Sequence, residues 1–346
     1  MKIIITGGAG FLGLHLAAFL TKKGYQITLV DIAPFEKSEY SESNKLEICD
    51  VRDKNKLESL TQGQDIIIHA AAALPLWSND DIYSTNINGT KAVLSLAKKY
   101  KMKRVIFISS TAVYGVPKKH PIEEGDPRVG VGAYGESKIQ AEDLCFKAIK
   151  EELNVTIIRS KTFVGTGRLG VFEILFDWIH DGKKIPVIGN GQNRYQLLDV
   201  DDLVAAVYLF CLKNEKKYNG AFNIGAKDFQ SVGKDLQELF DFAKSGSQIL
   251  PTPSFLVKKA LWLFDKIGIS PLYQWVYDTA DKDSYVSIDK LTKTLHWEPR
   301  YSNSEALIKS YSWYMKNYDK IKSKKSGVTH TVGWKQGILA MFKKFA

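Results

Sequence analysis

Short, almost wholly apolar runs recur through the first half of the chain, and stretches with helical periodicity separate most of them. The apolar runs occupy 2–6 (KIIIT), 26–31 (QITLVD), 46–51 (LEICDV), 65–71 (DIIIHAA), 104–109 (RVIFIS) and 155–160 (VTIIRS). Residues 11–23 and 84–100 have the spacing of amphipathic helices. Uninterrupted apolar strands that alternate with helices are typical of a parallel sheet covered on both faces. Because crossovers between parallel strands are right-handed, we predict an α/β fold with a doubly wound parallel sheet.

The alternation becomes less regular after residue 160, which indicates a second, smaller lobe. Short strand-like runs lie there among helical stretches, at 185–189, 195–200 and 221–225. We therefore predict a sheet domain over 1–160, completed by segments from 161–240. The smaller C-terminal lobe is expected mainly over 161–318, and 319–346 are predicted to form a basic amphipathic tail.

The formal net charge of +10 is concentrated in this tail, because 320–346 contain seven lysines and no acid. The rest of the chain carries a net charge of only +3, which argues against nucleic acid as a partner. The tail also has an apolar stripe of Trp334, Ile338, Met341, Phe342 and Phe345. Such a helix either rests on the anionic inner face of a membrane, or docks on its own domain or on a partner.

Composition places the chain among globular proteins, with 346 residues, 45% of them hydrophobic and 25% charged. No run of 18 uncharged apolar residues occurs, so no membrane-spanning helix is expected. The three cysteines, Cys49, Cys145 and Cys211, are scattered, which favours a reducing, cytoplasmic compartment. We expect no secretion signal, because Met1 leads directly into a strand-like run, and no metal site, because the histidines are dispersed. A homodimer is compatible with the sequence.

A glycine cluster, TGGAGFLG, follows the first apolar run directly. Gly7, Gly10 and Gly13 stand between a predicted strand and a predicted helix, so the loop lies at the helix N-terminus. There the free backbone N–H groups and the helix dipole attract a pyrophosphate, and glycine lets the backbone approach it. For this motif alone, a plain glycine-rich turn remains the alternative.

Acidic residues at the ends of the next runs favour a dinucleotide. Asp31 follows Gly13 by 18 residues, where a carboxylate can hold an adenosine ribose diol and repel the 2′-phosphate of NADP. The sequence therefore predicts NAD, and Asp50 is expected near its adenine amino group. The predicted cofactor-binding residues are Gly7, Gly10, Phe11, Leu12, Gly13, Asp31, Asp50, Val51, Ala70, Ala71, Tyr134 and Lys138.

Tyr134 and Lys138 stand four residues apart in the segment YGESK, so a helix would place the phenol and the ammonium on one face. A neighbouring cation lowers a phenol's pKa from ~10 and makes the phenolate available as a base. The alternative for this spacing is an exposed aromatic side chain beside a solvated lysine. Upstream, FISSTAVYG ends the fifth apolar run with hydroxyl groups, at the sheet edge where ligands bind. A serine there can hydrogen-bond a substrate oxygen as it changes from alcohol to ketone.

Six motifs together carry a family resemblance: TGGAGFLG, DVRD, HAAA, NINGT, SSTAVYG and YGESK. This set resembles the extended short-chain dehydrogenases/reductases, specifically the NAD-dependent epimerase/dehydratase family. The resemblance covers about 1–240, and LHWEPRYSNSEAL at 295–307 matches the family's usual ending. It implies a Rossmann domain that binds NAD and a C-terminal lobe that binds the substrate.

The resemblance also implies catalytic roles for three residues. Tyr134 would be the general base, and Lys138 would lower its pKa and contact the nicotinamide ribose. Ser110 would hydrogen-bond the substrate hydroxyl, because it precedes the Val-Tyr-Gly of this motif by three residues, where the family places its serine or threonine. A secondary hydroxyl would be oxidised to a transient ketone, and return of the hydride to the opposite face would invert the carbon.

Departures from the family pattern limit the substrate. Thr111 and Ala112 stand where the family's dehydratases carry Asp-Glu, so we do not expect dehydration. Thr162 stands where nucleotide-sugar enzymes often have asparagine, and Arg194 is one position from the usual arginine. The candidate substrate-binding residues are Thr111, Thr162, Arg168 and Arg194. An apolar arm over 250–277 is either core-facing or suited to a hydrophobic substrate, as in hydroxysteroid-dehydrogenase-like members.

Three functions are compatible with these features. The first is an NAD-dependent epimerase that acts on a sugar carried by a nucleotide or by a lipid diphosphate. The second is a dehydrogenase of a hydrophobic alcohol, similar to 3β-hydroxysteroid dehydrogenases. The third, a non-catalytic NAD-sensing protein, is disfavoured by the set of Ser110, Tyr134 and Lys138. Net NADH production separates the first two, because an epimerase recycles its cofactor.

Overall fold

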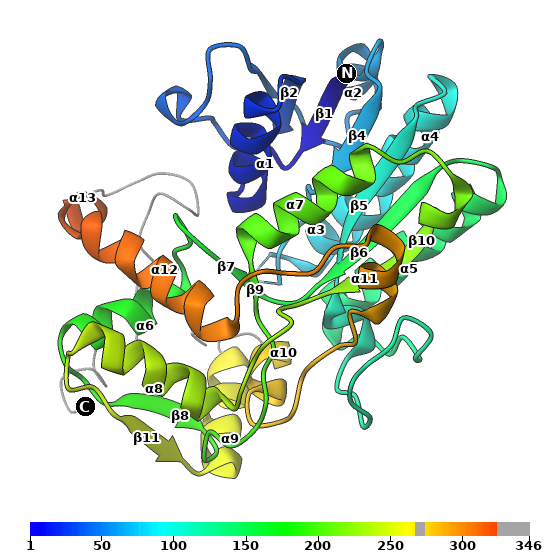
Figure 1. Ribbon diagram of the computed structural model, residues 1–346. Helices are drawn as coiled ribbons and strands as arrows, with labels where there is room; N and C mark the ends of the chain where they lie inside the picture. The colour runs from blue at the N-terminus through cyan, green and yellow to red at the C-terminus, as the bar shows by residue number, and fades with distance from the viewer. Residues whose placement is uncertain (76, 267–273, 324–346) are drawn as a thin grey trace.

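The computed structural model describes residues 1–75, 77–266 and 274–323, and in this part a sheet domain lies beside a smaller lobe (Figure 1). The main sheet has seven parallel strands in the order β10-β6-β5-β4-β1-β2-β3. These strands are β1 (Lys2–Thr6), β2 (Gln26–Asp31), β3 (Lys45–Ile48), β4 (Ile66–His69), β5 (Arg104–Ser110), β6 (Val155–Ser160) and β10 (Gly220–Ile224). The strand order reverses beside β1, which is the doubly wound Rossmann arrangement. The predicted fold class is confirmed.

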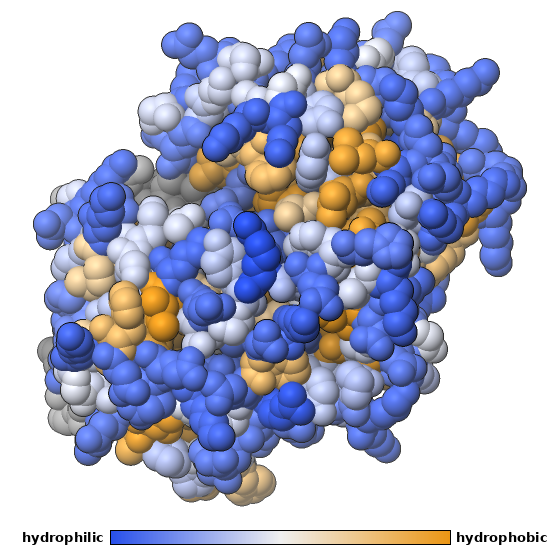
Figure 2. Space-filling model, in the orientation of Figure 1, coloured by the Kyte–Doolittle hydropathy of each residue, from blue (hydrophilic) through white to orange (hydrophobic). Residues whose placement is uncertain are grey.

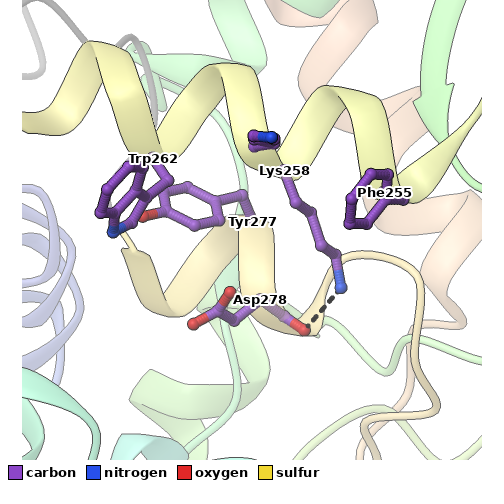
Figure 3. A pocket seen from close by; sticks show the side chains of 6 residues that line it. Phe255, Lys258, Trp262, Tyr277 and Asp278 are labelled. Atoms are coloured by element: carbon purple, nitrogen blue, oxygen red, sulfur yellow. Dashed lines mark hydrogen bonds between the residues drawn. The ribbon is translucent and has the colours of Figure 1, made fainter.

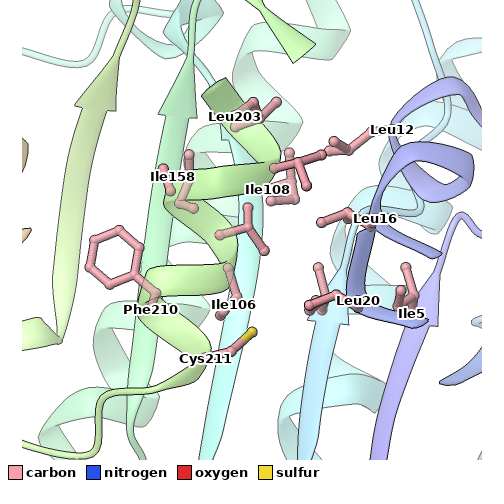
Figure 4. Close-up of a cluster of buried hydrophobic side chains, with 14 of the residues drawn as sticks. Ile5, Leu12, Leu16, Leu20, Ile106, Ile108, Ile158, Leu203, Phe210 and Cys211 are labelled. Atoms are coloured by element: carbon pink, nitrogen blue, oxygen red, sulfur yellow. The ribbon is translucent and has the colours of Figure 1, made fainter. Parts of the chain in front are cut away.

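Helices cover both faces of this sheet, because alternate residues of each apolar strand point to opposite sides. On one face pack α1 (Phe11–Lys22) and α7 (Val200–Cys211), as Figure 4 shows. The other face is covered by α2 (Lys54–Thr61), α4 (Thr90–Lys99) and α5 (Gly132–Lys150). Ile3 and Ile5 therefore face α1, whereas Ile4 belongs to the opposite core.

Short elements connect the strands of the sheet domain. They are η1 (Lys37–Glu39), α3 (Asn79–Tyr83), the π-helical turn η2 (Ser84–Gly89), η3 (Thr111–Tyr114) and η4 (Lys216–Tyr218). Two strand predictions are too long at their ends, because β3 stops at Ile48 and β4 stops at His69. The chain leaves the sheet at these points to form the loops that carry the candidate cofactor residues.

The smaller lobe has its own apolar core, formed mainly by helices on two short parallel pairs of strands. The pairs are β8 (Ile185–Ile188) with β11 (Ile249–Thr252), and β7 (Phe163–Val164) with β9 (Leu198–Asp199). The helices of this part of the chain are α6 (Val171–His180), α8 (Val232–Ala243), α9 (Ser254–Lys266), α10 (Gln274–Thr279), α11 (Asp289–Leu295), α12 (Asn303–Lys316) and α13 (Tyr318–Ser323). The strand predicted at 195–200 is shorter than expected, because the Asp199 side chain caps α7 and the helix begins at Val200.

The face of the molecule that Figure 2 shows is mostly hydrophilic, with apolar side chains gathered in separate groups. The three cysteines are free and buried. Within the described ranges, no helix combines the length and apolar character that crossing a bilayer requires. Of the predicted tail, the part from residue 324 onward lies outside the described residues, so its apolar stripe is not placed.

Candidate active site

The glycine loop between β1 and α1 packs so closely that side chains are excluded from it. Gly7 has φ +75°, and a Cβ on it would lie 2.7 Å from the backbone nitrogen of Ala71 and 2.8 Å from the carbonyl carbon of Ala70. A Cβ on Gly13 would collide with the carbonyl oxygen of Gly7. The structure thus brings Gly7, Gly13, Ala70 and Ala71 into direct contact, although the two segments are 63 residues apart in the chain.

Asp31 is fixed beside this loop at the carboxyl end of β2. The Ala9 N–H donates to its Oδ2 at 3.0 Å, and the Ala33 N–H donates to its Oδ1 at 2.9 Å. Helix α1 begins after Gly10, which has no side chain to cap it, and no acid stands in its first turn. The partial positive charge of this helix end therefore remains available to an anion. Loop, helix end and carboxylate together fit the pyrophosphate and ribose of NAD.

Asp50 and Val51 lie just beyond β3, on the same edge. The Asp50 carboxylate accepts hydrogen bonds from Arg52 Nε at 3.0 Å and Arg52 Nη2 at 2.7 Å. These bonds to Arg52 lower the pKa of Asp50, so it stays an ionised acceptor. Val51 is buried, and a Cβ on Gly89 would lie 2.7 Å from its Cγ2. Asp50 and Val51, both predicted cofactor-binding residues, therefore lie between the end of β3 and η2 and are held there by these contacts.

Tyr134 and Lys138 lie one turn apart on α5, as their spacing predicts. Lys138 is buried, its Nζ donates to the Ile108 carbonyl oxygen at 3.0 Å, and this Nζ lies 5.9 Å from the centre of the Tyr134 ring. Burial lowers the pKa of Lys138 to about 8, a shift that the charge of Glu142 partly opposes. Lys138 therefore remains mainly protonated at neutral pH and places a positive charge near the phenol.

Ser110 ends β5 at the carboxyl edge of the sheet, next to η3. Its Oγ accepts a hydrogen bond from the Ala112 N–H at 3.1 Å. A Cβ on Gly135 would lie 3.0 Å from the Ala112 carbonyl oxygen, so α5 packs closely on the turn that follows Ser110. Thr111 is buried, and its Oγ1 has no hydrogen-bond partner in the described part of the chain. Helix packing thus gathers the serine and the Tyr-Lys pair at one edge.

His69 is a further buried residue at this edge, and the sequence alone predicts no role for it. Its Nδ1 lies 2.7 Å from Thr6 Oγ1 and its Nε2 lies 3.1 Å from Thr90 Oγ1. Burial, with a smaller effect from the charge of Lys138, lowers its pKa to about 3. The neutral ring therefore ties β4 to β1 and α4, just before Ala70. The motif HAAA contains this histidine, but its partners lie far away in the chain.

A buried ionic cluster holds α5 in place one turn after Lys138. Glu142 accepts hydrogen bonds from Arg159 Nη2 at 2.7 Å, from Ser109 Oγ at 2.7 Å and from Arg128 Nη1 at 3.2 Å. Glu142 stands one turn after Lys138, and Ser109 immediately precedes Ser110. The cluster therefore positions both the helix and the strand end that carry the candidate catalytic residues. In the sequence, this cluster is indicated only by Glu142, an acid four residues after Lys138.

The other candidate substrate-binding residues occupy different surroundings. Thr162 Oγ1 lies 3.4 Å from the Tyr195 hydroxyl oxygen. The Arg194 guanidinium stacks on the rings of Phe229 and Tyr285, at 4.7 and 4.5 Å from their centres.

Arg168 contacts α1 and β7 instead of these rings. Its guanidinium carbon lies 5.1 Å from the centre of the Phe11 ring and 5.6 Å from that of Phe163. This places Arg168 next to the glycine loop, on the cofactor side of the site.

The apolar arm is partly core and partly surface. Leu261 and Tyr277 are buried. Exposed side chains of α9 are Phe255 (74%), Leu256 (62%), Trp262 (50%) and Leu263 (54%). Figure 3 shows the pocket between α9 and α10, where the Lys258 Nζ donates to the Asp278 carbonyl oxygen at 3.2 Å. The core-facing interpretation therefore accounts for only one side of this helix.

Comparisons with known proteins assign the family. Residues 3–225 match the model of the NAD dependent epimerase/dehydratase family. The chain is 32% identical over 272 residues to a UDP-N-acetyl-alpha-D-glucosaminuronate decarboxylase of Bacillus cytotoxicus, covering 73% of this chain and 83% of that protein. It is 25% identical to a UDP-glucose 4-epimerase of Halalkalibacterium halodurans, covering 91% of this chain and 96% of that protein.

A similar solved structure is the UDP-glucuronic acid 4-epimerase of Bacillus cereus in complex with UDP-glucuronic acid and NAD. Its TM-score is 0.74 at 22% identity, with 92% of this chain and 100% of that chain covered. At this identity, the likeness shows the fold alone. The family match covers more than half of the chain and includes the glycine loop and the Tyr-Lys pair. The chain therefore belongs to the NAD-dependent epimerase/dehydratase family, and it is an NAD-dependent enzyme.

Proposed function

We propose that this enzyme is an epimerase that oxidises a secondary hydroxyl of a nucleotide-linked sugar to a transient ketone and then reduces it. The observation that carries the proposal is the placement of Lys138. Its buried charge lies near the Tyr134 ring, on a helix packed against the turn after Ser110. The relatives named above act, by their names, on UDP-linked sugars.

In this proposal the glycine loop, Asp31 and Lys138 hold NAD, which when bound supplies the acceptor and donor of the hydride. Tyr134 takes the proton of the substrate hydroxyl through its phenolic oxygen and returns it in the reverse step. Lys138 stabilises the phenolate by its charge. Ser110 donates a hydrogen bond to the substrate oxygen while that oxygen is a ketone.

The residues after Ser110 favour epimerisation over water elimination. Thr111 and Ala112 are both buried in η3, and neither side chain is an acid or a base near neutral pH. Elimination of water needs an additional acid and base beside the sugar. Because Thr111 and Ala112 supply neither group, the ketone is expected to be reduced again instead of losing water.

The direct test supplies UDP-glucose, UDP-galactose and UDP-glucuronic acid to the NAD-loaded enzyme. We expect one of them to be converted to its epimer, with NADH remaining below the enzyme concentration because the cofactor is recycled. Stoichiometric NADH from a hydrophobic alcohol, with no sugar epimer formed, would favour the 3β-hydroxysteroid-dehydrogenase-like alternative instead.

A lipid-linked sugar diphosphate is a second candidate substrate, supported by the exposed face of α9. Phe255, Trp262 and Leu263 present aromatic and aliphatic surface beside Lys259, a combination suited to the interface of a membrane. In this case the enzyme would bind reversibly to the inner face of a membrane, through α9, the basic tail or both. The nucleotide-linked substrate requires no such contact.

We expect the double variant Phe255→Ser, Trp262→Ser to lose about half or more of its co-sedimentation with anionic vesicles, because apolar burial drives interfacial binding. The matched control is Phe242→Ser on α8, which removes a side chain that is also 50% exposed. A chain ending at Lys320 tests the tail separately. Equal sedimentation of all four proteins at low salt would rule out membrane binding through either segment.

A further inference from the structure

Lys161 is a buried lysine for which the proposed mechanism has no use. It follows β6 directly, and only 1% of the residue is exposed. Its Nζ donates to Ser284 Oγ at 2.7 Å and lies 4.7 Å from the centre of the Tyr195 ring. Within the described ranges, no carboxylate lies within ion-pair distance of this Nζ. A buried ammonium that lacks a counter-charge is strongly unfavourable, so its retention calls for a reason.

Other lysines with low exposure in this lobe have the partners that Lys161 lacks. Lys309 Nζ is bonded to Asp199 at 2.7 Å and to Asp201 at 2.6 Å. Lys258 Nζ is paired with Asp281. For Lys161, burial lowers the pKa to about 7, and the structure supplies only a hydroxyl and an aromatic ring. The site is therefore ready to accept an anion that the protein itself does not provide.

The position of Lys161 in the fold indicates where that anion would come from. Ser160 is the register partner of Ser110, so Lys161 leaves the sheet at the edge that holds the candidate catalytic serine. The next residue, Thr162, is a candidate substrate-binding residue, and its hydroxyl lies 3.4 Å from that of Tyr195.

An imidazole and a guanidinium stand near Lys161, both packed on Tyr285. The His120 ring packs on Tyr285 at 4.9 Å, and its buried Nε2 has no hydrogen-bond partner among the described residues. Arg194 stacks on the same tyrosine. The nearby acid is Asp283, which is exposed and accepts a hydrogen bond from the Arg194 backbone N–H at 2.8 Å. Burial lowers the pKa of His120, so its ring is a neutral hydrogen-bonding group here, and Arg194 supplies the positive charge on this side.

We propose that Lys161 binds an anionic oxygen group of the substrate, at the edge of the sheet beside Ser110. This assignment rests on the proposed nucleotide-sugar substrate, which offers such a group in its diphosphate and, for a uronic acid, in the carboxylate of the sugar. Both sources present the same chemistry to the ammonium, namely a charge-assisted hydrogen bond in a site of low polarity.

The test compares wild type with Lys161→Met, which keeps the unbranched shape and most of the length of the side chain and removes its charge. Calorimetry on the NAD-loaded enzyme measures binding of inorganic pyrophosphate, UDP-glucose and UDP-glucuronic acid. If Lys161 binds the diphosphate, the variant's affinity for all three ligands falls at least ~tenfold. If Lys161 binds the carboxylate of the sugar, only the affinity for UDP-glucuronic acid falls by this factor. Both results support the proposal. Affinities that all stay within about twofold of wild type overturn it.

The matched control is Lys290→Met, since the Lys290 Nζ donates to the Ala221 carbonyl oxygen at 2.7 Å and lies over the Phe222 ring at 4.6 Å. Among the described residues, this lysine also has no carboxylate within ion-pair distance, but it belongs to α11, which packs on the edge strand β10. We expect its replacement to leave all three affinities unchanged. Pyrophosphate binding that depends on Lys161, without binding of either UDP-sugar, would refute the nucleotide-sugar substrate and leave the anion site standing.

If Lys161→Met does not fold, wild type alone still decides the question. Titration with the same three ligands at pH 8, in two buffers of different ionisation enthalpy, reports proton uptake on binding. An anion beside Lys161 raises its pKa, so uptake of a fraction of a proton is expected. Binding of all the ligands without any proton uptake would overturn the proposal.

Discussion

Replacing Tyr134 by phenylalanine is expected to lower turnover by ~10²-fold or more while NAD binding persists. The substitution removes only the hydroxyl, and the ring keeps its place one turn before Lys138. The Lys138 Nζ retains its hydrogen bond to the Ile108 carbonyl oxygen, so the helix and the cofactor side of the site are preserved. Steady-state epimerisation rates at saturating UDP-sugar, together with NAD affinity by calorimetry, measure the two effects separately.

Tyr83→Phe is the matched control for this experiment. Its hydroxyl donates to Glu136 Oε2 at 2.5 Å, so it also contacts α5, but through a solvent-exposed hydrogen bond from the end of α3. We expect nearly normal turnover from this variant. Turnover of Tyr134→Phe within about threefold of wild type would contradict the assignment of Tyr134 as the base.

The features that the sequence predicts well depend on local pattern. Apolar runs and the helices between them follow the periodicity of their own residues, so the strands, the doubly wound fold class and the glycine loop could be expected from the sequence. The Tyr134–Lys138 pair is also local, because four residues span one helical turn. Strand ends were harder to predict, since side chains such as that of Asp199 decide where a helix begins.

The features that the sequence does not predict depend on contacts between distant segments. The hydrogen bond from Lys161 to Ser284 joins residues 123 positions apart, and His69 and Thr6 are 63 positions apart. No spacing rule relates such pairs, and a lysine after a strand is ordinarily expected to be solvated. The apolar arm illustrates the same limit. Periodicity shows that α9 has an apolar side, but not whether the protein itself covers it.

The second large effect concerns stability. Glu142→Gln is expected to lower the free energy of unfolding by about 3–5 kcal/mol, because removing one partner of a buried ion pair leaves the other charge uncompensated. Arg159 is almost fully buried, and the glutamine amide would offer it one acceptor oxygen but no counter-charge. Its other hydrogen-bond acceptors, the Tyr114 hydroxyl oxygen at 2.7 Å and the Glu124 carbonyl oxygen at 2.9 Å, are neutral as well. Urea denaturation followed by circular dichroism measures the change.

Glu151→Gln is the control, because Glu151 is exposed and pairs with Lys98 at 2.7 Å on the protein surface. Its replacement is expected to lower the free energy of unfolding by less than about 1 kcal/mol, since solvent screens exposed ion pairs.

Glu142→Gln should also lose activity at neutral pH. The charge of Glu142 raises the pKa of Lys138, so without it that pKa falls below about 8 and less of the lysine is protonated beside Tyr134. Equal, small losses of stability in both variants would show that Glu142 does not hold α5 against the sheet as its contacts indicate.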